Sequence, residues 1–439
     1  MRKRRPAARR ATMVGALAAA VAMVLSSCSS GGEVVVTVLT TPGVAQSSAP
    51  VTVPGQDAAA DPSGSQQAPP AETSSGKLAD AIRISAKPAF GSKNNGPNDP
   101  VTITVFSGKI AEMTVTGDDG STIEGKVGDD KATFTTTDKM TYGVTYTFAG
   151  TAVAPDNSTK KISGKISTVK PTSTVQALIQ IPEGGTVGVG APIVLTFLTP
   201  VTDKAAAEKA LKVTTDKGDI EGSWGWLQDE DFMNQGSQQS QVHFRPKEYW
   251  PANTKVTVTA DLAGVNLGDG AWGREDLVRH FTIGRKLVMV AAVETKHLVV
   301  WKDGKILRNY PVSYGKESEP GRTTVSGIHI VQRKDLEYKM TNPEFGYYNL
   351  PERWAIRINN NGEFIHENKG VEAAGYLGKR NVSHGCINMG GKDAEELYKM
   401  VIYGDPVEVT GTSVQMSAKD YVYDWAFSWE DWKNLSALG

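Results

Sequence analysis

Residues 297–301 read HLVVW, and a Lys-Asp-Gly-Lys turn separates them from a second strand-like run at 306–314. An Asp-Gly pair between two such runs is a strong β-hairpin signal, because these residues tolerate the positive φ of a tight turn. Residues 392–401 (KDAEELYKMV) have the character of a helix, and further strand-like runs surround the hairpin at 287–293, 327–331, 354–358 and 406–410. The stretch 285–412 is therefore predicted to be a mostly β domain with a helix packed on it.

Two stretches before this domain also have strand patterning. Residues 78–170 contain short alternating runs, including VTITV at 101–105 and ATFTT at 132–136, with turn residues between them. Period-2 alternation at this spacing is typical of an antiparallel sandwich. Residues 171–284 contain similar runs, such as IVLTF at 193–197. No residue cluster in either stretch points to catalysis, so both are predicted to be immunoglobulin-like spacers.

The chain begins with a basic and then an apolar segment. The first ten residues hold six of the 47 Lys and Arg, residues 11–25 are apolar, and Leu-Ser-Ser-Cys follows, ending at Cys28. A basic head, an apolar run too short to span a bilayer and small residues at its end are typical of a secretory signal. LSSC resembles the lipobox of bacterial lipoproteins, which predicts a signal at 1–28 and lipidation of Cys28. The alternative is simple cleavage near Ser27 or Ser29, with Cys28 incidental.

A polar segment and an acidic remainder follow this signal. Residues 29–77 are rich in Ala, Pro, Ser, Gly and Thr and contain no aromatic residue. Such a stretch buries too little apolar area to offset the entropy of ordering, so it is predicted to be a disordered tether. Loss of the six basic residues of 1–28 leaves 41 Lys and Arg against 48 Asp and Glu, a formal charge of −7. This balance argues against a nucleic-acid partner, because phosphate binding needs a cationic face.

The chain has two cysteines, Cys28 and Cys386, so no framework of intrachain disulfides is expected. Cys386 lies in the run SHGCIN at 383–388, and His366 lies twenty positions before it. A thiol becomes a useful nucleophile as the thiolate, which a nearby imidazolium stabilises. Backbone amides around a glycine such as Gly385 suit an oxyanion. The pattern predicts a Cys/His site for acyl transfer.

Several other interpretations of these residues remain open at this point. His384 is nearer in sequence than His366 and is a second candidate for the base. Cys386 would also be compatible with a buried apolar position, as free cysteines often are. The three residues do not make a convincing zinc site, because a fourth ligand at suitable spacing is missing, and no metal is predicted. The remaining histidines lie on strand-like segments and are predicted to be structural: His243, His280, His297 and His329.

His366 followed by SHGCIN matches the H-x(n)-[S/T]-H-G-C-x-N signature of L,D-transpeptidase catalytic domains of the YkuD type. The runs WPANTKV at 250–256 and GVNLGDGAWG at 264–273 look like the second immunoglobulin-like domain of the mycobacterial-type enzymes. The tail, 413–439, looks like their C-terminal extension, and its tryptophans are expected to dock on the body. The chain thus resembles multidomain actinobacterial L,D-transpeptidase lipoproteins, with two Ig-like sandwiches before the β-rich catalytic domain at 285–412.

The resemblance implies peptidoglycan cross-linking without a cofactor. In the family, the Cys thiolate attacks the third residue of a donor tetrapeptide stem and releases D-Ala. The side-chain amine of the diamino acid on an acceptor stem then takes the acyl group, which gives a 3→3 link. The implied partners are donor and acceptor stems, carbapenems as covalent inhibitors, and the membrane through the lipid anchor. The expected location is the cell membrane, facing the cell wall.

The resemblance also implies roles for individual residues. Cys386 matches the nucleophile and His366 the base. The loop and oxyanion-hole groups match Ser383, His384 and Gly385. Substrate contacts are implied for Tyr348, Asn361, Gly362 and Asn388, and contacts from a lid over the pocket for Met340 and Phe345.

One position departs from the mycobacterial-type pattern, because Glu367 follows His366 where those enzymes have Ser. Either the carboxylate of Glu367 orients the imidazole, as the Asp of a hydrolase triad does, or a backbone carbonyl does so while Glu367 faces solvent. The sequence leaves both open. It also leaves two alternative functions: a Cys-dependent L,D-carboxypeptidase or endopeptidase on the same stems, and a non-catalytic Ig-bearing scaffold that binds the wall.

Overall fold

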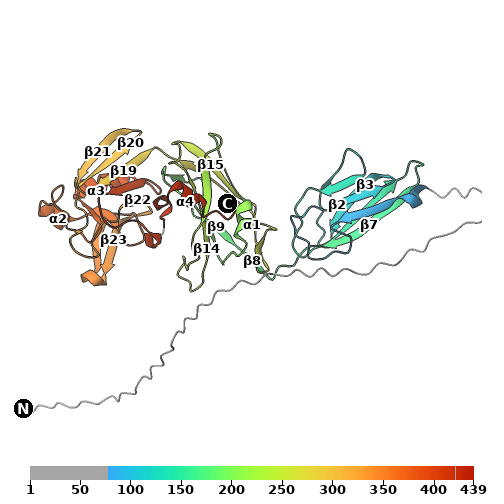
Figure 1. Cartoon of the computed structure of the whole chain (residues 1–439), viewed down its shortest axis with the longest axis horizontal. Helices are drawn as coiled ribbons and strands as arrows, with labels where there is room; N and C mark the ends of the chain where they lie inside the picture. The colour runs from blue at the N-terminus through green and yellow to red at the C-terminus, as the bar shows by residue number, and fades with distance from the viewer. Residues whose placement is uncertain (1–77, 421) are drawn as a thin grey trace, which may run out of the picture. The chain divides into compact units, whose positions relative to one another are not determined.

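The computed structural model describes residues 78–420 and 422–439 (Figure 1). The predicted signal, the lipidation site Cys28 and the tether at 29–77 lie outside the described residues. Strands make up most of the regular structure and helices are short, which confirms the mostly β prediction. Within the described part of the chain, no helix combines the length and apolar character needed to cross a membrane.

The first sandwich consists of two antiparallel sheets with the strand orders β1-β2-β5-β4 and β3-β6-β7. Its core is shared between the sheets, since Ile103 and Phe134 of one pack with Tyr146 and Ile162 of the other. The elements are η1 (Leu78–Ala81), β1 (Arg83–Lys87), β2 (Thr102–Phe106), β3 (Lys109–Gly117), β4 (Gly125–Val127), β5 (Thr133–Thr136), β6 (Thr145–Val153) and β7 (Thr159–Ser167).

The second sandwich is built from the sheets β10-β18-β15-β12 and β13-β14-β11-β9, with a small sheet β16-β17-β8. Its core contains the fully buried ring of Trp250, which donates from Nε1 to the carbonyl of Ala191 at 2.8 Å. The strands are β8 (Ser173–Val175), β9 (Ala177–Ile179), β10 (Thr186–Val187), β11 (Ile193–Phe197), β12 (Leu211–Thr215), β13 (Gly222–Trp226), β14 (Ser240–Pro246), β15 (Thr254–Ala260), β16 (Asn266–Gly268), β17 (Ala271–Gly273) and β18 (Leu277–Ile283). The helix α1 (Lys204–Lys209) lies between β11 and β12.

The third domain contains the sheets β21-β20-β19-β27-β22 and β23-β24-β25-β26. The predicted hairpin is present, with Asp303 and Gly304 at φ 50° and 78° between β20 and β21. Helix α3 buries Ala394 and Leu397 in the domain core. The elements are β19 (Leu287–Ala292), β20 (His297–Lys302), β21 (Lys305–Pro311), β22 (Gly327–Ile330), β23 (Arg333–Asn342), η2 (Pro343–Phe345), β24 (Tyr347–Arg357), β25 (Phe364–Glu367), α2 (Lys369–Ala373), β26 (Ile387–Met389), α3 (Gly391–Met400) and β27 (Pro406–Thr410).

Direct contacts join the second sandwich to the third domain. The amide of Gly188 donates to the carbonyl of Tyr403 at 2.7 Å. The guanidinium of Arg285, at the start of the third domain, makes two hydrogen bonds of 2.7 and 2.6 Å to the carboxylate of the fully buried Asp405. Paired hydrogen bonds of this kind fix both distance and orientation, so the guanidinium of Arg285 is held against the loop before β27.

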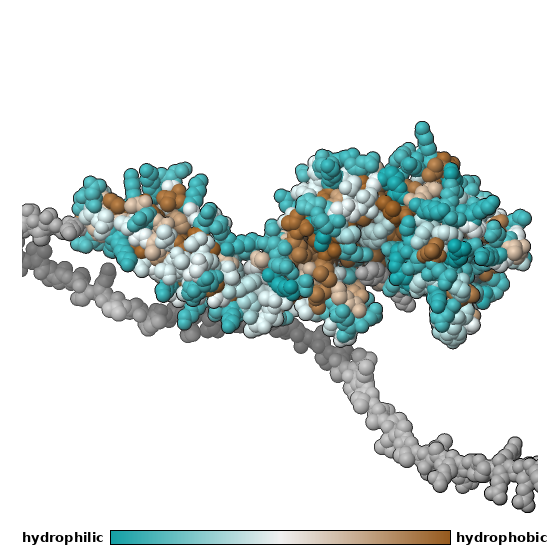
Figure 2. Space-filling model, turned by 180° about the vertical axis from the view of Figure 1, so that it is seen from behind, coloured by the Kyte–Doolittle hydropathy of each residue, from teal (hydrophilic) through white to brown (hydrophobic). Residues whose placement is uncertain are grey.

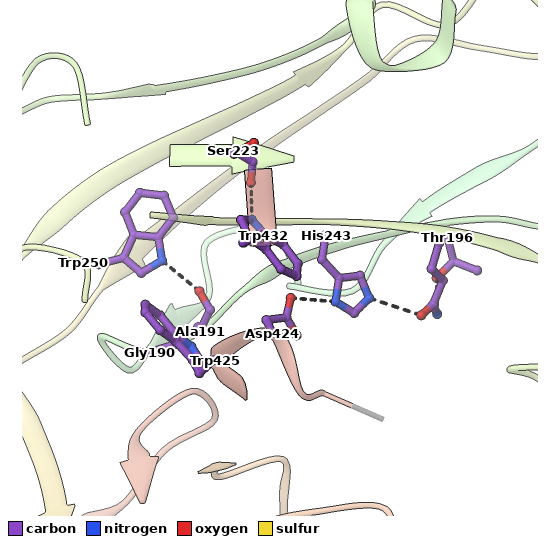
Figure 3. Close-up of polar contacts among 10 residues, drawn as sticks. Gly190, Ala191, Thr196, Ser223, His243, Trp250, Asp424, Trp425 and Trp432 are labelled. Carbon is purple, nitrogen blue, oxygen red and sulfur yellow. Dashed lines mark hydrogen bonds and ion pairs between the residues drawn. The ribbon is translucent and has the colours of Figure 1, made fainter. Parts of the chain in front are cut away.

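The C-terminal tail packs on the second sandwich, as its tryptophans predicted. It comprises η3 (Ala418–Asp420), η4 (Asp424–Ala426) and α4 (Trp429–Lys433), and Figure 1 shows the red α4 against the green strands of that sandwich. Trp432 is completely buried, and its Nε1 donates to the carbonyl of Ser223 on β13 at 2.9 Å. Trp425 donates in the same way to Gly190 at 2.9 Å (Figure 3).

The tail also explains why every residue of β14 is buried. Val242 and Phe244 face the sandwich core, whereas His243 and Arg245, which alternate with them, contact the tail. Nδ1 of His243 lies 2.9 Å from Oδ1 of Asp424, and both side chains are fully buried (Figure 3). The guanidinium of Arg245 lies 4.7 to 5.4 Å from the ring centres of three tail tryptophans, Trp425, Trp429 and Trp432. Two buried polar side chains of β14, His243 and Arg245, therefore have partners in the tail.

The surface itself is largely polar. Hydrophilic residues cover most of the face seen in Figure 2, and the most continuous apolar area on that face lies over the second sandwich. Among the large apolar side chains of the second sandwich, Val278 is 51% exposed and Leu178 is 40% exposed.

We expect Trp432→Ala to destabilise the tail and the second sandwich together, because it removes a fully buried ring and a hydrogen bond. Truncation of a buried tryptophan costs about 3–5 kcal/mol. Trp301, which is 37% exposed on β20, provides the matched control, and Trp301→Ala is expected to have little effect. Differential scanning calorimetry of both variants checks this, and equal shifts in melting temperature would show that the tail does not hold the sandwich.

Candidate active site

Parallel pairing of β25 with β26 assembles the site. In this register Ile365 lies beside Ile387 in the domain core, and His366 lies beside Asn388. Cys386 directly precedes β26, so the pairing brings it next to His366 although the two are twenty residues apart. Successive side chains of a strand point to opposite faces, so His366 shares its face with Phe364, whose cluster also includes Cys386.

His366 is 3% exposed and held by one strong hydrogen bond. Its Nδ1 lies 2.7 Å from the backbone carbonyl of Glu367, which leaves Nε2 for the thiol. Burial alone would lower its pKa, but its interactions with Cys386 and with the carboxylate of Glu352 outweigh burial and raise the pKa to about 10. The imidazole therefore carries a second proton at neutral pH, which is the state that stabilises a neighbouring thiolate.

The side chain of Glu367 does not orient His366. Strand alternation directs it to the opposite face of β25, where a Cβ added at Gly391 would lie 2.6 Å from its Oε1. Gly391 is the first residue of α3, so the carboxylate lies at the positive end of the helix dipole. Of the two roles left open by the sequence, the backbone carbonyl of residue 367 orients the ring, and the carboxylate faces the helix rather than solvent.

The loop before Cys386 is held by side chains on both sides. Oγ of Ser383 donates to the carbonyl of Cys386 at 2.6 Å and accepts from the amide of Gly385 at 3.2 Å. Thr324 donates from Oγ1 to the carbonyl of Gly385 at 2.7 Å. Because the Gly385 amide is bonded to Ser383, the loop amides without an acceptor among the described residues are those of His384 and Cys386. These two are the candidates for an oxyanion hole.

Gly385 has a φ of 120°, which an L side chain rarely adopts, and a Cβ there would lie 3.2 Å from Oε1 of Glu363. Glu363 is 6% exposed and accepts the amide of Val325 at 2.9 Å and the side-chain amide of Asn359. Burial, with a further contribution from Asp420, raises its pKa to about 8. The carboxyl group of Glu363, mostly protonated at neutral pH, thus lies next to Gly385 in the loop that precedes Cys386. No motif in the sequence points to Glu363.

A pocket opens beside the thiol, and Met340 of β23 lies at its wall. Asn388 is the most buried of the polar residues that line this pocket, with 2% of its surface exposed. Its Oδ1 has no hydrogen-bond partner within the described residues. An unpaired buried acceptor facing a pocket is a suitable contact for a substrate amide. The lining residues are Met340, Tyr347, Leu350, Glu352, His366, Asn368, Val371, Val382, Ser383, His384, Cys386 and Asn388.

Tyr348, expected at the substrate pocket, lies outside it and is 65% exposed. Its neighbour Tyr347 lines the pocket instead, and burial together with the charges of Cys386 and Glu352 raises its pKa. The resemblance implied a pocket contact for Tyr348 from its position six residues before Trp354. That spacing does not predict which tyrosine reaches the pocket, because the backbone of β24 is irregular. Trp354 has a φ of 54° and Asn349 a φ of 52°, and the pairing with β23 shifts register near the hairpin end.

The other expected contacts are divided between the pocket and its surroundings. The carbonyl of Gly362 lies 3.9 Å from Sγ of Cys386. The side chain of Asn361 is instead bonded to Asp420 of the tail and is not part of the pocket lining. Phe345 packs on the ring of His384 at 4.7 Å between ring centres rather than lining the pocket itself.

His384 occupies an environment that disfavours a positive charge. Burial, followed by the charge of Arg322, lowers its pKa, and its ring packs between Phe345 and Tyr347. His366 is therefore the histidine that can pair with the thiol as a cation. Among residues 78–420 and 422–439, no group of three or more His, Cys, Asp or Glu side chains is arranged to hold a metal ion.

A thiol lies beside a buried, protonated imidazole, next to free loop amides and a pocket, on a β domain that follows two sandwiches. This arrangement has the features that a Cys/His acyl-transfer site requires. Comparison with known proteins agrees with this class. A bacterial Ig domain model matches residues 92–266, and an L,D-transpeptidase catalytic domain model (YkuD) matches residues 285–409. The chain belongs to the L,D-transpeptidase family and is an L,D-transpeptidase.

The similarity extends beyond the catalytic domain. L,D-transpeptidase 5 of Mycobacterium tuberculosis (strain ATCC 25618 / H37Rv) is 42% identical over 359 residues, 82% of this chain and 78% of the relative. L,D-transpeptidase 2 of Mycobacterium tuberculosis (strain CDC 1551 / Oshkosh) is 31% identical over 343 residues, 76% and 80% of the two chains. A solved structure of LdtMt1 in complex with imipenem has 30% identity and a TM-score of 0.44, covering 55% of this chain and 100% of that one.

The family resemblance implies covalent reaction with carbapenems, and on that basis we expect Tyr347→Ala to slow acylation by imipenem and Tyr348→Ala to leave it unchanged. Loss of an aromatic contact at the pocket corresponds to roughly a three- to tenfold reduction in the rate. Stopped-flow absorbance of imipenem measures both rates, and the adjacent tyrosines control for each other's effect on the hairpin. A larger effect at Tyr348 would place the pocket on the other face of β24.

Proposed function

We propose that Cys386 is the nucleophile of this L,D-transpeptidase and that His366 is its base and acid. The observation that carries the proposal is the interaction of the thiol with a buried imidazole whose Nδ1 is engaged by a backbone carbonyl. A ring held in this way presents Nε2 to the sulfur in one orientation. A fixed thiolate–imidazolium pair is the activated form of a cysteine nucleophile.

The first half of the reaction acylates the enzyme. The Cys386 thiolate attacks the carbonyl carbon of the third residue of a donor tetrapeptide stem, and the amides of His384 and Cys386 stabilise the oxyanion. His366 gives its proton to the nitrogen of the departing D-Ala as the C–N bond breaks. The products are a thioester on Cys386, free D-Ala and a neutral imidazole.

The second half transfers the acyl group to an acceptor stem. The side-chain amine of the acceptor's diamino acid attacks the thioester, and neutral His366 takes a proton from that amine. The C–S bond breaks, the thiolate–imidazolium pair is restored, and a 3→3 cross-link is formed. Bond energy passes through the thioester, so the cycle needs no metal or nucleotide.

The same site suits the carbapenems. A solved relative is described in complex with imipenem, a β-lactam. Attack of Sγ of Cys386 on the strained lactam carbonyl would break the lactam C–N bond, and His366 would give its proton to the lactam nitrogen. That nitrogen stays tethered to the acyl group, so the leaving group would remain in the pocket and hinder attack on the thioester. Carbapenems are therefore proposed as covalent inhibitors of this chain.

The proposed site of action is the outer face of the cell membrane. Lipidation of Cys28 would anchor the chain, and the segment 29–77 would carry the folded part toward the wall. Peptidoglycan stem peptides, as donor and acceptor, are the proposed partners.

Purified protein incubated with tetrapeptide-containing muropeptides is expected to form dimers with 3→3 links and to release D-Ala. Cys386→Ala and His366→Ala are each expected to lose this activity almost completely, by analogy with other nucleophile–base pairs that act as a unit. Mass spectrometry of the products distinguishes the alternatives. Free tripeptide without dimer would support the hydrolase, and no turnover or imipenem adduct would support the non-catalytic scaffold.

Lipid anchoring has a separate test. In cells that export the protein, Cys28→Ala is expected to move it from the membrane fraction to the soluble fraction, because the acyl chains are lost. Fractionation followed by immunoblotting measures the distribution, and Cys386→Ala serves as the matched cysteine control. A Cys28→Ala protein that stays with the membrane would rule out the lipobox assignment.

A further inference from the structure

Glu352 is the acidic residue whose carboxylate lies at the imidazole of His366, and the sequence around it carries no motif. It lies on β24, its side chain is 15% exposed, and its Oε2 is 3.4 Å from Nδ1 of His366. It also lines the pocket beside Cys386. The carboxylate of Glu352 therefore faces the imidazole from β24, whereas Glu367, which follows His366 in sequence, lies on β25.

The backbone of β24 is distorted next to this residue. Trp354 has a φ of 54°, in the left-handed region, which is unfavourable for an aromatic residue. Its ring packs on Tyr398 of α3, with 5.3 Å between ring centres, while Ala355 and Ile356 are fully buried beyond it. Packing on both sides thus maintains the distortion, and the chain before it presents Glu352 to the pocket.

The two acceptors at Nδ1 contribute differently. The carbonyl of Glu367, at 2.7 Å, takes the Nδ1 hydrogen and sets the orientation of the ring. It has no net charge, so it favours the cationic ring only through its dipole. Glu352 adds a full negative charge in a largely buried site, where an opposite charge within a few ångströms favours the protonated form of a histidine.

We propose that Glu352 is a positioning residue that keeps His366 as the imidazolium beside Cys386, so that a proton is ready for the leaving group. The proposal rests on the assignment of Cys386 and His366 as nucleophile and base. Glu352 acts through His366 and does not itself exchange a proton with the substrate.

Other titratable groups around the pair do not supply this charge. Tyr347, from the other end of β24, faces both Cys386 and Glu352 and has a raised pKa, so it stays neutral. His384 has a lowered pKa. The carboxylate of Glu367 lies on the far face of β25, at the start of α3. Among these side chains on the elements that surround the His366 ring, Glu352 is thus the one that presents a carboxylate to it.

The test compares pH profiles of imipenem acylation in the full chain carrying Cys28→Ala, which leaves Cys386 as its one thiol. Acylation requires the His366 proton, so the rate falls as the imidazolium deprotonates, with an alkaline limb near pH 10. We expect Glu352→Gln to move that limb to lower pH by roughly one to three units. Stopped-flow mixing keeps acylation faster than hydrolysis of imipenem in alkaline buffer.

Two further variants separate charge from shape. Glu352→Asp keeps the charge with a shorter side chain and is expected to keep most of the alkaline limb. If Glu352 acts only through its shape, Glu352→Gln keeps the alkaline limb of the acylation rate and Glu352→Asp changes it, because Gln matches the shape of Glu and Asp does not. Glu337→Gln removes an exposed carboxylate from the neighbouring strand β23 and is expected to match the parent.

Each remaining outcome decides the question. An unchanged alkaline limb in Glu352→Gln would overturn the proposal. If that variant instead acylates normally with imipenem but has a raised KM for the acceptor stem, Glu352 binds the substrate amine and the positioning role is wrong. Absence of an adduct on Cys386 in the parent chain would overturn the nucleophile assignment itself, which is a distinguishable failure.

Discussion

The parallel pairing of β25 with β26 is the constraint on which the site depends. It sets His366 beside Asn388 and places Cys386 at the point where the chain enters the sheet. Ile365 and Ile387, paired in the same register, are fully buried in the domain core. The packing that stabilises the domain is therefore also the packing that fixes the distance between the thiol and the imidazole, and a register slip would separate them.

The remainder of the domain adjusts the chemistry of that pair. A carbonyl on the same strand orients the ring, Ser383 and Thr324 hold the loop, and a mostly protonated Glu363 lies beneath it. Charge is concentrated on one side of the ring, where Glu352 approaches Nδ1. His366 is thus a buried imidazolium with the Glu367 carbonyl, the Glu352 carboxylate and Cys386 as its partners. A buried charge is stable only when it has such partners.

The second sandwich is more than a spacer for this domain. Its strand β14 has a polar face that finds its partners in the C-terminal tail, and the tail follows the catalytic domain in the chain. The Arg285–Asp405 pair lies at the junction of the same two parts. A chain that leaves the catalytic domain and returns to the preceding sandwich ties the two together, so their stabilities are expected to be coupled.

The sequence by itself predicted the mostly β class, the hairpin at Asp303-Gly304 and the docking tail, because turn residues and alternation are local features. It also predicted Cys386 and His366 as the candidate nucleophile and base, because they match a long motif. It did not determine the strand at Phe364–Glu367, whose alternation alone would have directed Glu367 away from His366. Only the tertiary structure placed Tyr347 rather than Tyr348 at the pocket, and Glu352 at the imidazole. Both depend on the irregular backbone of β24, which packing against α3 and the domain core maintains and which no local pattern encodes.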